Sequence, residues 1–156
     1  MRPPIALVLH NIRSAHNVGA IFRTADAAGV SQIILTGYTP TPLDRFKRPQ
    51  KEIAKTALGA ENFIPWEYAK SPRTLLRRFK DDGYRVVGIE QDARSRDYRV
   101  FTAEKPTLFI FGNEVRGMSP SLRNSCDELL QIPMFGRKES LNVATTAGII
   151  LFQAIR

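Results

Sequence analysis

The last stretch of the chain, residues 132–156, constrains the fold more than any other part of the sequence. It begins as the end of an apolar strand, passes through a polar loop, and then runs to the C-terminus without a proline. Ser140 stands where a helix N-cap is expected, so the helix is predicted to begin with Leu141. Small residues fill its second turn, and residues 149–152 are apolar on every side. The pattern therefore predicts a buried final helix, although chain termini usually fray.

Segments typical of strands alternate with segments typical of helices along the rest of the chain. Strands are predicted over residues 5–10, 31–36, 62–66, 85–90, 107–111 and 129–134. Further helices are predicted over residues 17–28, 50–58, 72–82 and 119–126, the first of them capped by Asn17. This alternation predicts one α/β domain over residues 1–156, with a mostly parallel sheet flanked by helices.

The charge balance indicates a polyanionic partner. The 23 Lys and Arg residues outnumber 15 Asp and Glu residues, for a net charge of +8. On charge alone, a solubilising surface excess explains this as well as nucleic-acid binding does. The distribution favours nucleic acid, because the basic residues cluster in three segments, 45–51, 73–80 and 94–99.

Other classes of protein are disfavoured by what the sequence contains. No apolar run reaches the roughly 18 residues that a membrane span needs. The single cysteine, Cys126, permits no internal disulfide and no thiolate metal site, and the two histidines lack ligand spacing. We therefore predict no bound metal and no membrane contact, and we expect a reducing cytoplasm.

Three loops rich in glycine and polar residues are the places to look for chemistry, because parallel sheets bind ligands outside the carboxyl ends of their strands. They cover residues 11–19, 112–117 and 135–142. None carries a dinucleotide-binding glycine motif, a phosphate-binding P-loop or a nucleophile elbow. An ordinary nucleotide fold and triad hydrolysis are therefore not supported.

Individual residues in these loops allow two interpretations each. Arg23 could bind a phosphate near the start of the first helix, or it could be a solvated helix residue. Glu114 could orient a loop, or it could form a structural ion pair with Arg116. Ser140 by itself is better explained as a cap than as a catalyst. The functional interpretation gains weight because three such loops occur in one small basic domain.

Taken together, the three loops carry motifs that resemble those of the SpoU (TrmH) family of RNA ribose 2′-O-methyltransferases, in the SPOUT superfamily. The motifs are NVGAIFR at 17–23, FGNEVRG at 111–117, and IPM at 132–134 followed by SLNVA at 140–144. Each string is weak alone, but all three occur in order and span nearly the whole chain.

The resemblance implies S-adenosylmethionine as methyl donor and a C-terminal deep trefoil knot, in which the buried last helix passes through a loop. It also implies a homodimer whose active site lies at the subunit interface. The implied cofactor-binding residues are Ile89, Gly112, Ile132, Ser140 and Leu141. The implied catalytic residues are Asn17, Arg23, Glu114, Ser140 and Asn142.

For the reaction, we expect Arg23 to bind a phosphate and to stabilise negative charge on the ribose 2′-oxygen, because a guanidinium is a poor base. We expect Asn17 and Asn142 to position the 2′-oxygen, and Glu114 to fix the arginine or the loop. RNA contacts are expected from the domain itself, with no separate RNA-binding domain, through Arg13, Arg45, Lys47, Arg48 and Arg116.

The substrate is expected to be RNA, with tRNA favoured over rRNA. Two alternatives stay open at this point. The chain could be a catalytically inactive RNA-binding homodimer of the same fold, or a methyltransferase that acts on a small molecule or a protein.

Overall fold

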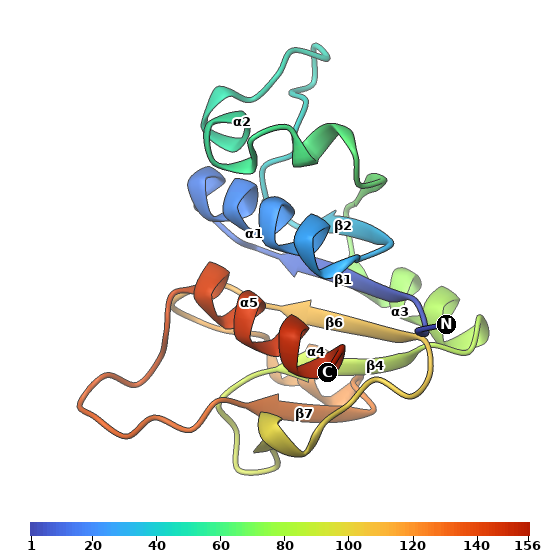
Figure 1. The fold of residues 1–156 in the computed structure, drawn as a ribbon, viewed down its shortest axis with the longest axis vertical. Helices are drawn as coiled ribbons and strands as arrows, with labels where there is room; N and C mark the ends of the chain where they lie inside the picture. Colours follow the sequence, from blue (N-terminus) through green and yellow to red (C-terminus); the bar gives the residue numbers. More distant parts are fainter.

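The computed structural model describes residues 1–156 and shows a seven-stranded sheet with helices on both faces (Figure 1). The strands are β1 Ile5–His10, β2 Gln32–Thr36, β3 Trp66–Ala69, β4 Arg85–Ile89, β5 Arg96–Asp97, β6 Thr107–Phe111 and β7 Glu128–Gln131. The α-helices are α1 Ala15–Ala28, α2 Lys51–Ala57, α3 Pro72–Asp81, α4 Pro120–Asn124 and α5 Val143–Ala154. Two 3₁₀ turns, Ala60–Asn62 and Tyr98–Val100, complete the set.

The sheet has the strand order β3-β2-β1-β6-β4-β7-β5, and every neighbouring pair is parallel. The predicted α/β architecture with a mostly parallel sheet is therefore confirmed. Because the strands are parallel, the loops that follow β1, β2, β4, β6 and β7 all leave the same edge of the sheet. That edge carries all three motif loops.

The central strands are buried on both faces, which explains why β1 shows no alternation of apolar and polar residues. Leu7 and Leu9 face a 26-residue core beneath α1, α2 and α5. Ala6 and Val8 face the opposite way, into a 12-residue core beneath α3 and α4. No helix combines the length and the hydrophobicity that crossing a membrane requires.

The last helix, α5, lies beside α1 and is buried along one side through Ala147, Ile150 and Leu151 (Figure 1). Its final turn is held by the segment that follows β5. The amide of Ala103 donates to the carbonyl of Ala154 at 2.9 Å. The prediction of a buried terminal helix is thus confirmed for its inner side. It is wrong for the outer side, where Phe152 is 51% exposed.

Both predicted helix caps beside the motifs are corrected by the structure. Ser14, not Asn17, caps α1, because the Ser14 hydroxyl accepts the Asn17 amide at 3.1 Å. Asn142, not Ser140, caps α5, because its Oδ1 accepts the amide of Ala144 at 2.8 Å. In each pair both residue types cap well, so local preference could not choose between them. The correction leaves the side chain of Asn17 and that of Ser140 available for other contacts.

The predicted strand at residues 62–66 is also wrong. Those residues include the end of a 3₁₀ turn, and strand pairing begins at Trp66 because Pro65 has no amide to donate to the ladder. The short strand β5 was not predicted, because two paired residues are too few to leave a pattern.

Candidate active site

A cavity of about 280 Å³ opens at the carboxyl ends of β4, β6 and β7. The loop after β6 and the loop between β7 and α5 form its walls. The five residues predicted to bind the cofactor come from different parts of the chain, and all of them line this one cavity. They are Ile89, Gly112, Ile132, Ser140 and Leu141.

Glycine is required at the start of the β6 loop because the chain turns back on itself there. A Cβ atom on Gly112 would lie 2.9 Å from the backbone of Gly117 and 2.9 Å from the amide nitrogen of Met118. Gly117 itself has φ of +65°, and a side chain there would collide with the carboxylate of Glu90. The loop can therefore close over the cavity only with glycine at both ends.

The carboxylate of Glu90 locks this loop from the neighbouring strand end. Its Oε2 accepts the amide of Met118 at 2.7 Å, and the residue lines the cavity. Gln91, the next residue, donates through Nε2 to the carbonyl of Ile132 at 2.8 Å, which ties the β4 end to the β7 loop. Neither residue was predicted from the sequence. The signal that could have found them is their position, directly after a buried strand and opposite two motif loops.

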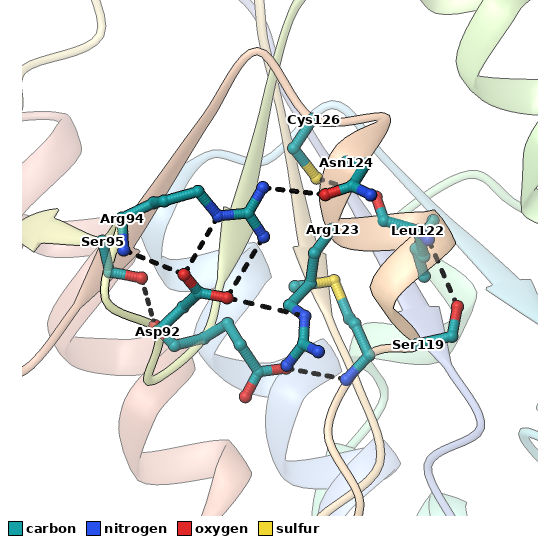
Figure 2. A network of polar contacts seen from close by, with 10 residues as sticks. Asp92, Arg94, Ser95, Ser119, Leu122, Arg123, Asn124 and Cys126 are labelled. Atoms are coloured by element: carbon teal, nitrogen blue, oxygen red, sulfur yellow. Dashed lines mark hydrogen bonds and ion pairs between the residues drawn. The ribbon is translucent and has the colours of Figure 1, made fainter.

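The turn that follows Glu90 is fixed against α4 by the ion-pair network in Figure 2. Asp92 accepts from Arg94 Nε at 3.1 Å and lies 3.6 Å from Arg123 Nε. Arg94 Nη1 also donates to Asn124 at 2.7 Å. Hydrogen bonds from Arg94 hold the pKa of Asp92 at about 2, so this carboxylate stays charged near neutral pH. The network gives the β4 side of the cavity a rigid support.

Asn113 joins the first two motif loops. Its side chain is almost buried, and its Nδ2 donates to the carbonyl of Asn11 and to the hydroxyl of Tyr38, both at 2.9 Å. Its Oδ1 accepts the amides of Val115 and Arg116. All its hydrogen-bonding groups are thus satisfied by three separate segments. No role was predicted for Asn113, because its partners are far away in sequence.

Glu114 orients a loop and does not form the ion pair with Arg116 that the sequence also allowed. Its carboxylate accepts the amide of Arg13 at 3.3 Å and that of Ser14 at 3.4 Å, just before α1. The carboxylate therefore sits at the N-terminal end of α1, where the helix dipole favours negative charge.

The first and third motifs meet in a direct side-chain contact. Asn142 Nδ2 donates to Asn17 Oδ1 at 3.1 Å, although the two residues are 125 positions apart. This contact is possible because Ser14 caps α1, which leaves the side-chain oxygen of Asn17 free to accept. It places Asn17 next to the loop that holds Ser140 and Leu141.

The loop between β7 and α5 offers hydrogen-bond donors to a ligand. From Met134 to Leu141 no backbone amide donates a hydrogen bond within the chain. Ser140 is exposed and lines the cavity, since the capping role falls to Asn142. The cavity therefore combines apolar walls at Ile89, Ile132 and Leu141 with free backbone amides.

Arg23 is the one predicted catalytic residue that lies apart from the cavity and its hydrogen-bonded rim. It is exposed on α1 and lines a second hollow between α1, the C-terminal end of α2 and α5. That hollow is also lined by Lys55, Leu58 and Phe152. The structure of one chain therefore does not bring Arg23 together with the residues of the cavity.

The residues predicted to contact RNA occupy two places. Arg116 lines the cavity and Arg13 is exposed beside Glu114. Arg45, Lys47 and Arg48 lie on the long loop between β2 and α2. Of the other basic segments, 94–99 is neutralised by acids: Arg94 pairs with Asp92, Arg96 with Glu128 and Arg99 with Asp97.

Known proteins resemble this chain in both sequence and fold. The sequence profile described as "SpoU rRNA Methylase family" matches residues 4–152. The chain belongs to this family. The resemblance stated from the three motifs is therefore confirmed.

Among curated relatives, the chain is 36% identical to the 23S rRNA (guanosine-2′-O-)-methyltransferase RlmB of Ralstonia nicotianae. The match covers 99% of this chain but 59% of that protein, so the chain spans less than two thirds of the length of this relative.

Two solved structures show the same fold. An AdoMet-bound rRNA methyltransferase from Sinorhizobium meliloti superposes with a TM-score of 0.85 at 34% identity, covering 98% of this chain and 56% of that one. The TrmH/SpoU tRNA modifying enzyme of A. aeolicus gives a TM-score of 0.84 at 28% identity, covering 97% and 74%.

Proposed function

We propose that this chain is an S-adenosylmethionine-dependent methyltransferase that methylates a ribose 2′-hydroxyl of RNA. One observation carries the proposal: five residues from three segments, assigned to cofactor binding by motif, line a single cavity beside the Asn17–Asn142 contact. The name of the R. nicotianae relative and the AdoMet-bound S. meliloti structure support it.

The residues of the cavity fit an adenosyl group. The apolar side chains of Ile89, Ile132 and Leu141 offer surfaces for a flat ring, and the unpaired amides of the β7–α5 loop can donate to its nitrogen atoms. Glu90 is one of three glutamates that line the cavity, with Glu114 and Glu139, and a sulfonium or amino group is a suitable partner for such a carboxylate. When bound, the sulfonium supplies an electrophilic methyl group.

The protein contributes alignment and charge. Arg23 binds a phosphate next to the target ribose and stabilises negative charge that develops on the 2′-oxygen. Asn17 and Asn142 hold the ribose in line with the cavity, and Glu114 keeps the loop before α1 in place. Alignment of a nucleophile with its electrophile accounts for a large part of such a rate enhancement.

Arg23 reaches a cavity only if it is the cavity of a second subunit, so we propose a homodimer. Its separation from the cavity of its own chain supports this. So does Phe152 beside it, the one large apolar side chain of α5 that is exposed. Association through the outer side of α1 and α5 would cover this ring and deliver each arginine to the partner's site.

We also propose that the C-terminal region forms a deep trefoil knot. The segment from β5 to β6 lies outside β7 and returns across the end of α5. Gln153 Nε2 donates to the carbonyls of Arg99 and Phe101, both at 3.1 Å. These contacts support a path in which the last helix passes inside that segment.

The decisive experiment is calorimetry with S-adenosylhomocysteine, followed by transfer of labelled methyl from S-adenosylmethionine to tRNA and to 23S rRNA. We expect binding and transfer that is lost when the substrate carries a 2′-deoxy sugar at the modified nucleotide. Binding of RNA without binding of S-adenosylhomocysteine would instead identify an inactive RNA-binding dimer. We expect tRNA to be the better substrate, and exclusive labelling of rRNA would reverse that choice.

A further inference from the structure

The loop between β2 and α2 ends in a rigid, charged tip, residues 44–48, that projects beyond α2 (Figure 1). Leu43 and Pro49 form an antiparallel bridge at its neck. Inside it, the carboxylate of Asp44 accepts the amides of Phe46 at 2.8 Å and Arg48 at 3.0 Å. Lys47 takes φ of +61° to close the turn. We call residues 44–48 the cationic tip.

An aromatic ring stands at the centre of this tip. Phe46 is 62% exposed, although burial of such a ring would be favourable. The guanidinium carbons of Arg45 and Arg48 lie 4.8 and 4.9 Å from its centroid. The Asx turn at Asp44 fixes the backbone that carries the ring, so the ring is presented to solvent at little further entropic cost on binding.

Two of the three cationic side chains around Phe46 are available to bind an anion. Arg48 pairs with Asp44 at 3.1 Å, but Arg45 and Lys47 have no acidic partner. The arginines of residues 94–99, by contrast, are each paired with an acid. Another exposed aromatic residue, Phe63, is 71% exposed and has no arginine over its ring. Among the exposed aromatic rings of the chain, Phe46 alone has an arginine over it.

We propose that Phe46 stacks on an unpaired base of the RNA substrate while Arg45 and Lys47 contact the flanking phosphates. The inference rests on the proposed function and adds a residue that distinguishes single-stranded RNA from a duplex. Aromatic rings between cations are the usual platform for unpaired bases, because every base has a face to stack and a phosphate on each side. An apolar protein partner would not need the free cations.

The tip is also connected to the cavity. The base of the same loop carries Tyr38, whose hydroxyl accepts from Asn113 in the cavity rim at 2.9 Å. The backbone amide of Tyr38 donates to Asn11 of the first motif loop at 3.1 Å. A base held by Phe46 would therefore be fixed relative to the loops that surround the reacting nucleotide.

The test uses fluorescence anisotropy with a labelled 12-nucleotide oligouridine and, as a paired probe, an RNA duplex of 12 base pairs. We expect Phe46→Ala to weaken binding of the single strand about 10-fold, as loss of one stacked base does. Phe46→Leu should weaken it almost as much, whereas Phe46→Trp should retain it. Duplex binding should change little. Phe63→Ala is the matched control and should behave as the unchanged protein.

The salt dependence separates stacking from charge. Phe46→Ala should lower affinity without altering the slope of log K against log salt, since it removes no phosphate contact. Arg45→Ala should reduce that slope by about 0.7 if it removes one contact with single-stranded RNA.

Three results would overturn the inference: single-strand binding by Phe46→Leu equal to that of the unchanged protein, an equal loss for duplex and single strand, or dissociation of a dimer by Phe46→Ala in sedimentation. The last would make the tip a protein contact. S-adenosylhomocysteine calorimetry on the same variants keeps the two proposals apart. If the unchanged protein does not bind S-adenosylhomocysteine, the proposed methyltransferase function is rejected. The oligouridine titration would still decide the role of Phe46.

Discussion

The cavity at the strand ends and the hollow beside Arg23 differ in how completely one chain builds them. The cavity is closed by contacts between distant segments, among them Glu90 to Met118 and Asn142 to Asn17. The hollow lies between α1, α2 and α5, and an apolar ring, Phe152, is exposed at its edge. Under the proposed function, the cofactor site would form within a single subunit, whereas the site for RNA chemistry would need a second one.

The largest effect that would sharpen this comparison is expected from Arg23→Ala. Loss of a preorganised donor to developing negative charge costs about 10²- to 10³-fold in kcat. Binding of S-adenosylhomocysteine should be unchanged, because Arg23 does not line the cavity. The measurement is methyl transfer together with calorimetry, and Lys55→Ala, in the same hollow, is the control.

Mixing subunits would show which chain supplies the arginine. At a concentration of S-adenosylmethionine too low to saturate Gly112→Ala, a dimer of one Arg23→Ala and one Gly112→Ala subunit should be more active than either variant alone, because one interface then combines an intact arginine with an intact cavity. No recovery in a purified mixed dimer would place Arg23 and the cavity of one chain in the same site.

Next in size is the effect of Phe152→Glu. A carboxylate at this position should oppose association and reduce methyl transfer by about 10-fold or more, because burying an unpaired charge at an interface is costly. The fold should persist, as the side chain is already half-exposed. Sedimentation should show a larger share of monomer than in the unchanged protein, with S-adenosylhomocysteine binding retained. A dimer of unchanged stability would remove the outer side of α5 from the interface.

A change confined to the cavity is Gly112→Ala. The added methyl would press on the backbone of residues 117–118, and overpacking of this kind costs about 1 to 3 kcal/mol. We expect S-adenosylhomocysteine to bind about 10-fold more weakly, with dimerisation intact. Gly136→Ala in the other wall is the matched control, since nothing lies within 4 Å of its added methyl. Equal affinity for both variants would contradict the role of the close turn.

The smallest effect is expected from Tyr38→Phe, which removes one hydrogen bond to Asn113. Asn113 keeps its bond to the Asn11 carbonyl, so the free energy of unfolding should fall by about 1 kcal/mol. Thermal unfolding would measure this. A loss of several kcal/mol would mean that the link between the two loops supports the whole cavity rim.

Much of the fold and part of the site could be predicted from the order of residue types. The apolar runs of β1 and β6 are long enough to mark buried parallel strands, and Gly112 follows a strand where a close turn is needed. The five residues predicted to bind the cofactor came from the family resemblance, four of them within its motif strings and Ile89 at the end of a strand, and they share one cavity. The caps at Ser14 and Asn142 were not found, because neighbouring residues of equal capping preference compete within three positions.

The sequence by itself determined that this is a basic α/β chain whose polar loops follow buried strands, since burial on both faces of a sheet demands continuous apolar runs. Only the tertiary structure decided which side chains meet. Asn113 reaches Asn11 across 102 positions and Asn142 reaches Asn17 across 125. The tertiary structure also placed Arg23 of α1 away from the cavity that lies next to Asn17 of the same helix. Such pairings depend on how helices and strands pack, and no local pattern of residues records them.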